Sequence, residues 1–128
     1  MRCVVSGGQT FDDYAFVAKI LDELHTNGFT RDKLIIPGPI TELANGKCSY
    51  GGADLLSDYW CDVNGLIPVH FPALWGRYQS AAGPKRNRHM LREFNPDLLV
   101  TFPGGHGTAN CIDEASTLHI PVYTPDYQ

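Results

Sequence analysis

Short apolar runs alternate with amphipathic stretches along the chain. The runs are aliphatic and a few residues long, which is typical of strands in a sheet that is covered on both faces. We expect five strands, at residues 2–6, 33–36, 67–71, 98–102 and 121–123. Between them, apolar residues recur at spacings of three and four, which is the period of a helix with one buried face. The predicted helices cover residues 11–27, 53–64, 84–94 and 108–118.

Local signals mark several helix ends. Thr10 and Asp13 have the spacing of a capping box, which predicts the start of the first helix there. Asn27 and Gly28 predict its end, because glycine readily adopts the left-handed conformation that terminates a helix. Pro84 suits the first position of a helix, where its missing amide hydrogen is not needed. Residues 37–51 and 72–83 show neither period and are predicted as long irregular connections.

The alternation of strands and helices predicts an α/β fold. Right-handed crossovers between successive strands would build a mostly parallel five-stranded sheet with helices on both faces. We predict one Rossmann-like, three-layer domain over residues 1–128. In the strand order 3-2-1-4-5, the first and fourth strands are neighbours at the centre of the sheet. Ligands bind beyond the carboxyl ends of such strands, so the loops that follow these two strands should converge on one site.

Composition and charge exclude several classes of protein. Hydrophobic residues make up 43% of the 128 residues and charged residues 19%, which is a globular composition. The net charge of −4 argues against nucleic acid as the main partner. No apolar run is long enough for a membrane span, and the first residues do not resemble a secretory signal, so we expect a cytoplasmic protein. The four cysteines and five histidines are scattered, so we expect no disulfide framework, metal site or cofactor.

The segment FPGGHGT at residues 102–108 joins a predicted strand to a predicted helix. Gly104, Gly105 and Gly107 would let a ligand approach the backbone closely, with amide groups at the helix start facing a phosphate. Thr108 either caps the helix or donates its hydroxyl to the phosphate. The alternative is a tight turn without a ligand, but the segment is denser in glycine than a turn requires.

The predicted topology also supports a ligand-binding role for two other segments. Gly7, Gly8 and Gln9 follow the first strand and form either a turn or a second binding loop. Gly52 precedes Asp54 at the start of the second helix, where a carboxylate is favourable on capping grounds alone. As a functional residue, Asp54 would accept a hydrogen bond from a ribose hydroxyl or a base edge.

Basic residues concentrate near the start of the helix predicted at 84–94. Lys85, Arg86, Arg88 and Arg92 fall within eight positions, and three of them occupy the predicted first turn, where the helix dipole disfavours cations. An anionic ligand would offset this cost, and a merely solvated cluster is the alternative. Arg86 and Asn87 are the preferred contacts, followed by Arg88.

Nucleophilic catalysis has less support than binding. Cys111 lies near the start of the last predicted helix, where a thiol pKa can fall, but a small buried hydrophobe is the favoured interpretation. His106 is a possible ligand contact in the glycine segment, and Glu114 with Arg86 is a weak catalytic pair. Trp75 and Tyr78 either stack on a ligand's purine or pack in the core or between subunits.

Four segments together resemble one known family. SGGQTFDDY, GGADLLSDYW, FPALWGRYQSAAGPKRNRHML and FPGGHGTAN, in this order, are similar to the YspA-like branch of the SLOG superfamily. These Rossmann-like domains are related to the LOG phosphoribohydrolases and to DprA. The resemblance covers nearly the whole chain and implies a nucleotide-derived ligand, such as an ADP-ribose relative, and a homodimer or larger homo-oligomer. It also implies a bacterial or phage origin.

The chain departs from this pattern at three places. Gln9 stands where the branch usually has Arg, and residues 37–50 resemble an insertion that would serve as a lid. Cys111 stands where the LOG enzymes place a catalytic Glu after the glycine segment. We therefore expect a protein that binds a phosphorylated nucleotide or an ADP-ribose-type or NAD-related signal, as a sensor or a sequestering protein. The alternative is a LOG-like hydrolase of nucleotide N-glycosidic bonds, acting through Arg86 with Glu114 or Asp54.

Overall fold

Five parallel strands form the central sheet of the computed structural model, which describes residues 1–128. Their order is β5-β4-β1-β6-β7, and every neighbouring pair is parallel. This confirms the α/β fold class and places the first strand beside the predicted strand at 98–102. The strands are β1 (Arg2–Ser6), β4 (Glu42–Asn45), β5 (Val69–His70), β6 (Leu98–Thr101) and β7 (Val122–Tyr123).

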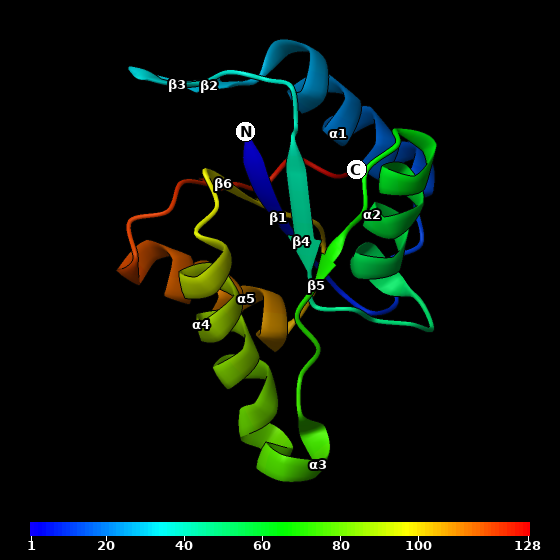
Figure 1. Ribbon diagram of the computed structural model, residues 1–128, viewed down its shortest axis with the longest axis vertical. Coiled ribbons are helices and arrows are strands. Elements are labelled where there is room, and N and C mark those ends of the chain that lie inside the picture. The colour runs from blue at the N-terminus through cyan, green and yellow to red at the C-terminus, as the bar shows by residue number, and fades with distance from the viewer.

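Two helices cover each face of the sheet (Figure 1). Side chains alternate along a strand, so Cys3 and Val5 of β1 enter the core beneath α1 and α2, whereas Val4 enters the core beneath α4 and α5. Both cores are built from aliphatic strand residues that are fully buried. The helices are α1 (Tyr14–Asn27), α2 (Gly52–Val63), α4 (Ala82–Phe94) and α5 (His106–Thr117).

The strand predicted at residues 33–36 is not part of this sheet. It is β3 (Leu34–Ile36), which pairs only with β2 (Phe29–Arg31) in an antiparallel ribbon that projects from one corner of the molecule (Figure 1). Its place in the sheet is taken by β4. The expectation that residues 37–50 are an inserted, irregular loop is therefore wrong for residues 42–45, which pair directly with β1.

Burial explains why β4 occupies the place in the sheet that was predicted for residues 33–36. Leu43, Ala44 and Asn45 are completely buried, because β4 lies between β1 and β5 with helices on both sides. Ile35 of β3 is 71% exposed, although its run is the more aliphatic of the two. Local strand propensity favoured residues 33–36, but the position between two strands and two helical layers selects β4.

Two helix starts also differ from the prediction. Asp13, rather than Thr10, caps α1, and its carboxylate accepts the Phe16 amide at 3.0 Å. Helix α4 begins at Ala82, so Lys85 and Arg86 lie beyond its first three residues. The expected cost of cations in the first turn of this helix is therefore smaller than the sequence suggested, since the dipole effect fades within that turn.

The connection predicted at residues 72–83 contains helical structure of its own. It holds the short helix α3 (Trp75–Tyr78) and the 3₁₀ helix η1 (Gln79–Ala81), which leads directly into α4. Together, α3 and the start of α4 project below the sheet in Figure 1. None of the helices is both long and apolar enough to cross a membrane.

Candidate functional site: a cleft at the carboxyl edge of the sheet

A cleft of about 470 Å³ opens at the carboxyl ends of the strands. This volume is within the range of roughly 300–1,000 Å³ that small-molecule sites occupy. The walls come from the loops after β1, β4, β5 and β6 and from the starts of α2, α4 and α5. Nine of the residues singled out from the sequence line it: Gly7, Gly8, Gln9, Asp54, Arg86, Asn87, Gly105, Gly107 and Thr108.

Some of the glycines near the cleft are required by the packing of loop against loop. The Gly8 amide donates to the Pro103 carbonyl at 2.8 Å, which ties the loop after β1 to the loop after β6. A Cβ atom at Gly7 would lie 2.6 Å from the Ala53 side chain. A Cβ atom at Gly104 would collide with the Thr108 hydroxyl and the Gly8 backbone. These glycines therefore shape the floor of the cleft, and their presence does not by itself indicate a ligand.

Gly105 and Gly107 have a different setting. A Cβ atom at either position would meet no atom within 4 Å, and neither residue has a positive φ. Internal packing therefore does not require glycine here. Both residues line the cleft at the start of α5, whose cap residue Gly105 offers no side chain to its first amide groups. Amides in the first turn of a helix have no intrahelical acceptor, so this helix start is suited to an anion.

Arg86 is the partly buried cation of the cleft, whereas Lys47, which also lines it, is exposed. The Arg86 Nη1 atom donates to the Gly46 carbonyl at 2.9 Å and more weakly to the Phe71 carbonyl at 3.4 Å. No carboxylate lies within ion-pair distance of its guanidinium group. A Cβ atom at Gly46 would overlap this guanidinium, so the loop after β4 lies directly against it. Arg86 is thereby held at the cleft wall with its charge uncompensated by a direct partner.

Asn87 positions its neighbours and is itself only 2% exposed. Its Oδ1 atom accepts the Arg86 Nε–H at 2.8 Å. Its Nδ2 atom donates to the Gly107 carbonyl at 3.2 Å and to the Asn110 side chain at 3.0 Å. The amide therefore couples the guanidinium on α4 to the start of α5. Its buried side chain is better described as a positioning group than as a direct ligand contact.

Asp54 contributes the carboxyl group of the cleft. Burial is the largest influence on it and raises its pKa to about 6 from the usual 3.8. The nearby Arg86 charge and the Gly46 backbone act in the opposite direction, and Asp58 adds to the increase. A cleft carboxyl group whose pKa lies this close to neutrality can hold or release a proton under ordinary conditions.

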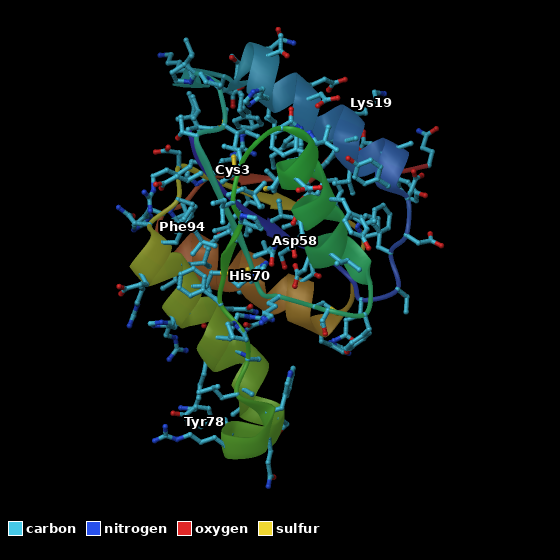
Figure 2. All side chains as sticks on the ribbon, turned by 45° about the vertical axis from the view of Figure 1, so that its right-hand side comes forward. Cys3, Lys19, Asp58, His70, Tyr78 and Phe94 are labelled. Atoms are coloured by element: carbon cyan, nitrogen blue, oxygen red, sulfur yellow. The ribbon has the colours of Figure 1, made fainter.

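A buried polar network next to Asp54 was not predicted from the sequence. Asn45, at the end of β4, is fully buried and donates through Nδ2 to Ser57 at 2.9 Å and to Asp58 at 2.7 Å. Asp58 also contacts His70 of β5, with both carboxylate oxygens 3.0 Å from Nε2, and Figure 2 labels this pair. The network fixes α2 against two strands and so orients Asp54. Its members are scattered in the sequence, and only the position of β4 brings them together.

Four predicted residues lie outside the cleft. Gly104 and His106 are both exposed near the start of α5 and do not line the cleft. Arg88 extends away from the cleft and forms a two-point ion pair with Glu114, at 3.2 and 3.1 Å. Glu114 does not line the cleft, and its carboxylate is engaged by Arg88.

Cys111 has the properties of a buried structural thiol. It is completely buried in the core beneath α4 and α5, and burial raises its pKa to about 11. A thiol with such a pKa carries almost no thiolate near neutral pH, which excludes it as a nucleophile in this state. Cys111 therefore has almost no acid–base capacity near neutral pH.

Most of the remaining walls come from residues that the sequence did not assign to the site. Residues 47–50, which follow β4, line one side. Pro72 and Ala73 line another, together with Trp75, for which the sequence left ligand stacking and packing open. The first segment was missed because its strand was missed. The chain contains no group of three or more His, Cys, Asp or Glu side chains placed to hold a metal ion.

Comparisons of the chain with protein-family models, with curated proteins and with solved structures found no match. The chemistry of the cleft is therefore the basis for assigning a function.

Proposed function

We propose that this protein binds a phosphorylated nucleotide or a nucleotide-derived small molecule in the cleft. The observation that carries the proposal is the start of α5. It has no side-chain cap, and it faces the cleft through Gly105 and Gly107, two glycines for which packing gives no reason. Arg86 supplies a positive charge in the same cleft without a direct ion-pair partner. A phosphate is the common ligand group that requires both features.

A carboxyl group close to Arg86 suits the sugar of such a ligand. Asp54 presents a carboxyl group near the first turn of α2, where a ribose hydroxyl would donate a hydrogen bond to it. A second phosphate at this position would be repelled by the ionised Asp54 carboxylate. The pairing of a cationic and an acidic side chain therefore favours a nucleotide over inorganic phosphate or a polyphosphate.

Two further considerations support a small-molecule ligand. The resemblance to the YspA-like branch of the SLOG superfamily implies an ADP-ribose-type or NAD-related signal and a homo-oligomeric assembly. The chain's net charge of −4 disfavours a nucleic acid partner. A sensor or sequestering role follows from the absence of a catalytic glutamate at Cys111.

Isothermal titration with AMP, ADP, ADP-ribose and NAD tests the proposal, with adenosine as the unphosphorylated control. We expect at least one phosphorylated ligand to bind and adenosine to bind far more weakly. Failure of the whole panel to bind would contradict the proposal.

Arg86 and Arg88 provide a matched pair of variants. Arg86→Ala removes the cleft cation, and we expect about a tenfold or greater loss of affinity, in line with about 1.5–3 kcal/mol for a hydrogen bond to a charged group. Arg88→Ala removes an equal charge two residues away that is paired with Glu114 outside the cleft. It should change affinity by less than about twofold, since exposed ion pairs contribute little. Equal losses in both variants would indicate a diffuse charge effect and no specific phosphate site.

The carboxyl group of Asp54 favours one second candidate, the hydrolysis of an N-glycosidic bond. A protonated Asp54 would donate its proton to the departing base as the bond to the ribose breaks. Water would then add its hydroxyl to the ribose carbon and return a proton to Asp54, so that one water is consumed. A pKa of about 6 is suited to such proton transfers near neutral pH. Chromatography of free base released from nucleoside monophosphates tests this, and an unchanged rate in Asp54→Asn would contradict it.

A further inference from the structure

Trp75 is a large aromatic residue whose position is not explained by packing. It begins α3, is 55% exposed and lines the cleft. It has no aromatic partner within stacking distance, no cation lies over its ring, and its indole N–H has no acceptor. An indole left in this state exposes apolar area to water at a cost in free energy, unless a ligand covers it.

The other tryptophan shows what a structural role requires in this fold. Trp60 of α2 is 1% exposed, packs edge-on against His25 and donates its indole N–H to Asp22 at 2.9 Å. Every part of that side chain has a partner in the protein. Trp75 has none of these contacts, so the core does not account for its presence.

The start of α4 leaves space beside this ring. A Cβ atom at Gly83 would lie 3.4 Å from the edge of the Trp75 indole, and Gly83 itself lines the cleft. The absence of a side chain at this position lets the ring lie against the helix while it remains open to the cleft. Tyr78, by contrast, lies near Arg77 and Lys85 and does not line this cleft. Figure 2 places Tyr78 at the far end of the projecting α3 region.

Trp75 and the glycines at the start of α5 follow different strands and line the same cleft. The glycines at the start of α5 follow β6, whereas Trp75 follows β5, and β1 and β4 lie between these strands. Neighbouring strands are about 4.8 Å apart, so three spacings separate β5 from β6 by about 14 Å. A nucleotide with its phosphate at α5 would extend its base towards Trp75.

We propose that the Trp75 indole stacks on the nucleobase of the bound ligand and is a residue that determines specificity. This inference rests on the proposed function, because it assigns the base end of a ligand whose phosphate lies at α5. It specifies the ligand class further, since a sugar phosphate without a base would leave Trp75 uncovered and bind more weakly than the nucleotide.

The test measures the affinity of Trp75→Ala for ADP-ribose, AMP and ribose 5-phosphate by isothermal titration. Stacking of a base on an aromatic side chain contributes about 1–3 kcal/mol, so we expect the variant to lose about fivefold or more in affinity for the two nucleotides. Its affinity for ribose 5-phosphate should remain within about twofold of the original protein. Trp75→Phe, which retains an aromatic ring, should recover most of the nucleotide affinity.

Intrinsic fluorescence gives an independent signal. Because Trp60 is buried, nucleotide binding should quench the emission of Trp75 in the original protein, and the quenching should disappear in Trp75→Phe. Leu74→Ala is the matched control, since Leu74 is 52% exposed next in sequence but does not line this cleft. Its affinities should be unchanged, and thermal unfolding of all three variants should resemble that of the original protein.

The outcomes separate this inference from the proposed function. The stacking role is wrong if nucleotides bind and Trp75→Ala leaves their affinity unchanged. It is also wrong if the variant loses affinity for ribose 5-phosphate to the same extent as for the nucleotides. In both cases the proposed function stands. If neither the nucleotides nor ribose 5-phosphate bind the original protein, the proposed function fails, and the base subsite fails with it.

Discussion

Two helix starts, those of α2 and α5, face the same cleft but differ in chemistry. At α2, the Ala53 amide already donates to the Gly8 carbonyl at 3.2 Å, and Asp54 adds a carboxyl group in the first turn. At α5, neither an acidic side chain nor a cap is present in the first turn. Gly105 and Gly107 leave the surface of this helix start open.

The difference shows that a glycine-rich helix start is not by itself a phosphate site. At α2, the Ala53 amide is already bonded to the Gly8 carbonyl, and an ionised Asp54 in the first turn would repel an anion. The start of α5 has neither feature and lies in the same cleft as Arg86. The glycines at the start of α2 are therefore expected to matter for folding, and those at the start of α5 for ligand binding.

Gly52→Ala should have the largest effect, on stability. Gly52 has a φ of +81°, and a Cβ atom would lie 2.5 Å from the Gly8 carbonyl oxygen. Backbone strain and overpacking together should lower the free energy of unfolding by about 3 kcal/mol or more, measured by urea denaturation. Gly65→Ala is the matched control, since Gly65 has a φ of +73° but no atom within 4 Å of its Cβ. If both variants lose the same free energy of unfolding, the close approach to the Gly8 carbonyl does not contribute to the loss in Gly52→Ala.

Gly107→Asp should have the next largest effect, on binding. The new carboxylate would lie at the start of α5, where it stabilises the helix by about 0.3–1 kcal/mol but repels an anionic ligand. We expect about a hundredfold loss of nucleotide affinity in isothermal titration, since facing like charges costs several kcal/mol. A variant that is stable and still binds with the original affinity would place the phosphate elsewhere.

Asp54→Asn should change how stability depends on pH. Burial raises the pKa of Asp54 to about 6 in the folded protein, so between about pH 4 and 6 the folded state holds a proton that the unfolded chain has lost. This carboxyl group therefore lowers stability as the pH rises through that window, and its effect is constant above it. The variant should gain stability over the original protein by up to about 3 kcal/mol at pH 7 and almost nothing at pH 4. The free energies of unfolding of the variant and the original protein would be measured by urea denaturation at pH 4, 5, 6 and 7. A difference between the two proteins that is the same at every pH would contradict the raised pKa of Asp54.

Gly107→Ala should have the smallest effect and should be favourable. The methyl group meets no atom within 4 Å, and alanine is a better helix former than glycine. We expect the free energy of unfolding to rise by about 0.5 kcal/mol in urea denaturation. A marked loss of stability would show that glycine is needed at this position for folding, and the contrast between the two helix starts would then disappear.

Much of the fold could be predicted because periodicity is a local property. The four long helices and the strands at 2–6 and 98–102 have apolar patterns that remain the same in any context. Their alternation was enough to predict the parallel sheet and the convergence of the loops after β1 and β6. The strand β4 was missed because its sequence, ELAN, has no strong strand propensity and owes its conformation to its neighbours.

The sequence by itself determined the fold class, the central pair of strands and nine of the 21 residues that line the cleft. Only the tertiary structure decided which of these residues are free to act. It paired Arg88 with Glu114, buried Cys111, and separated the glycines required by packing from those that face open space. The physical reason is that hydrogen bonds, ion pairs and steric contacts join residues that are distant in the chain. A local pattern contains the residue types but not their partners.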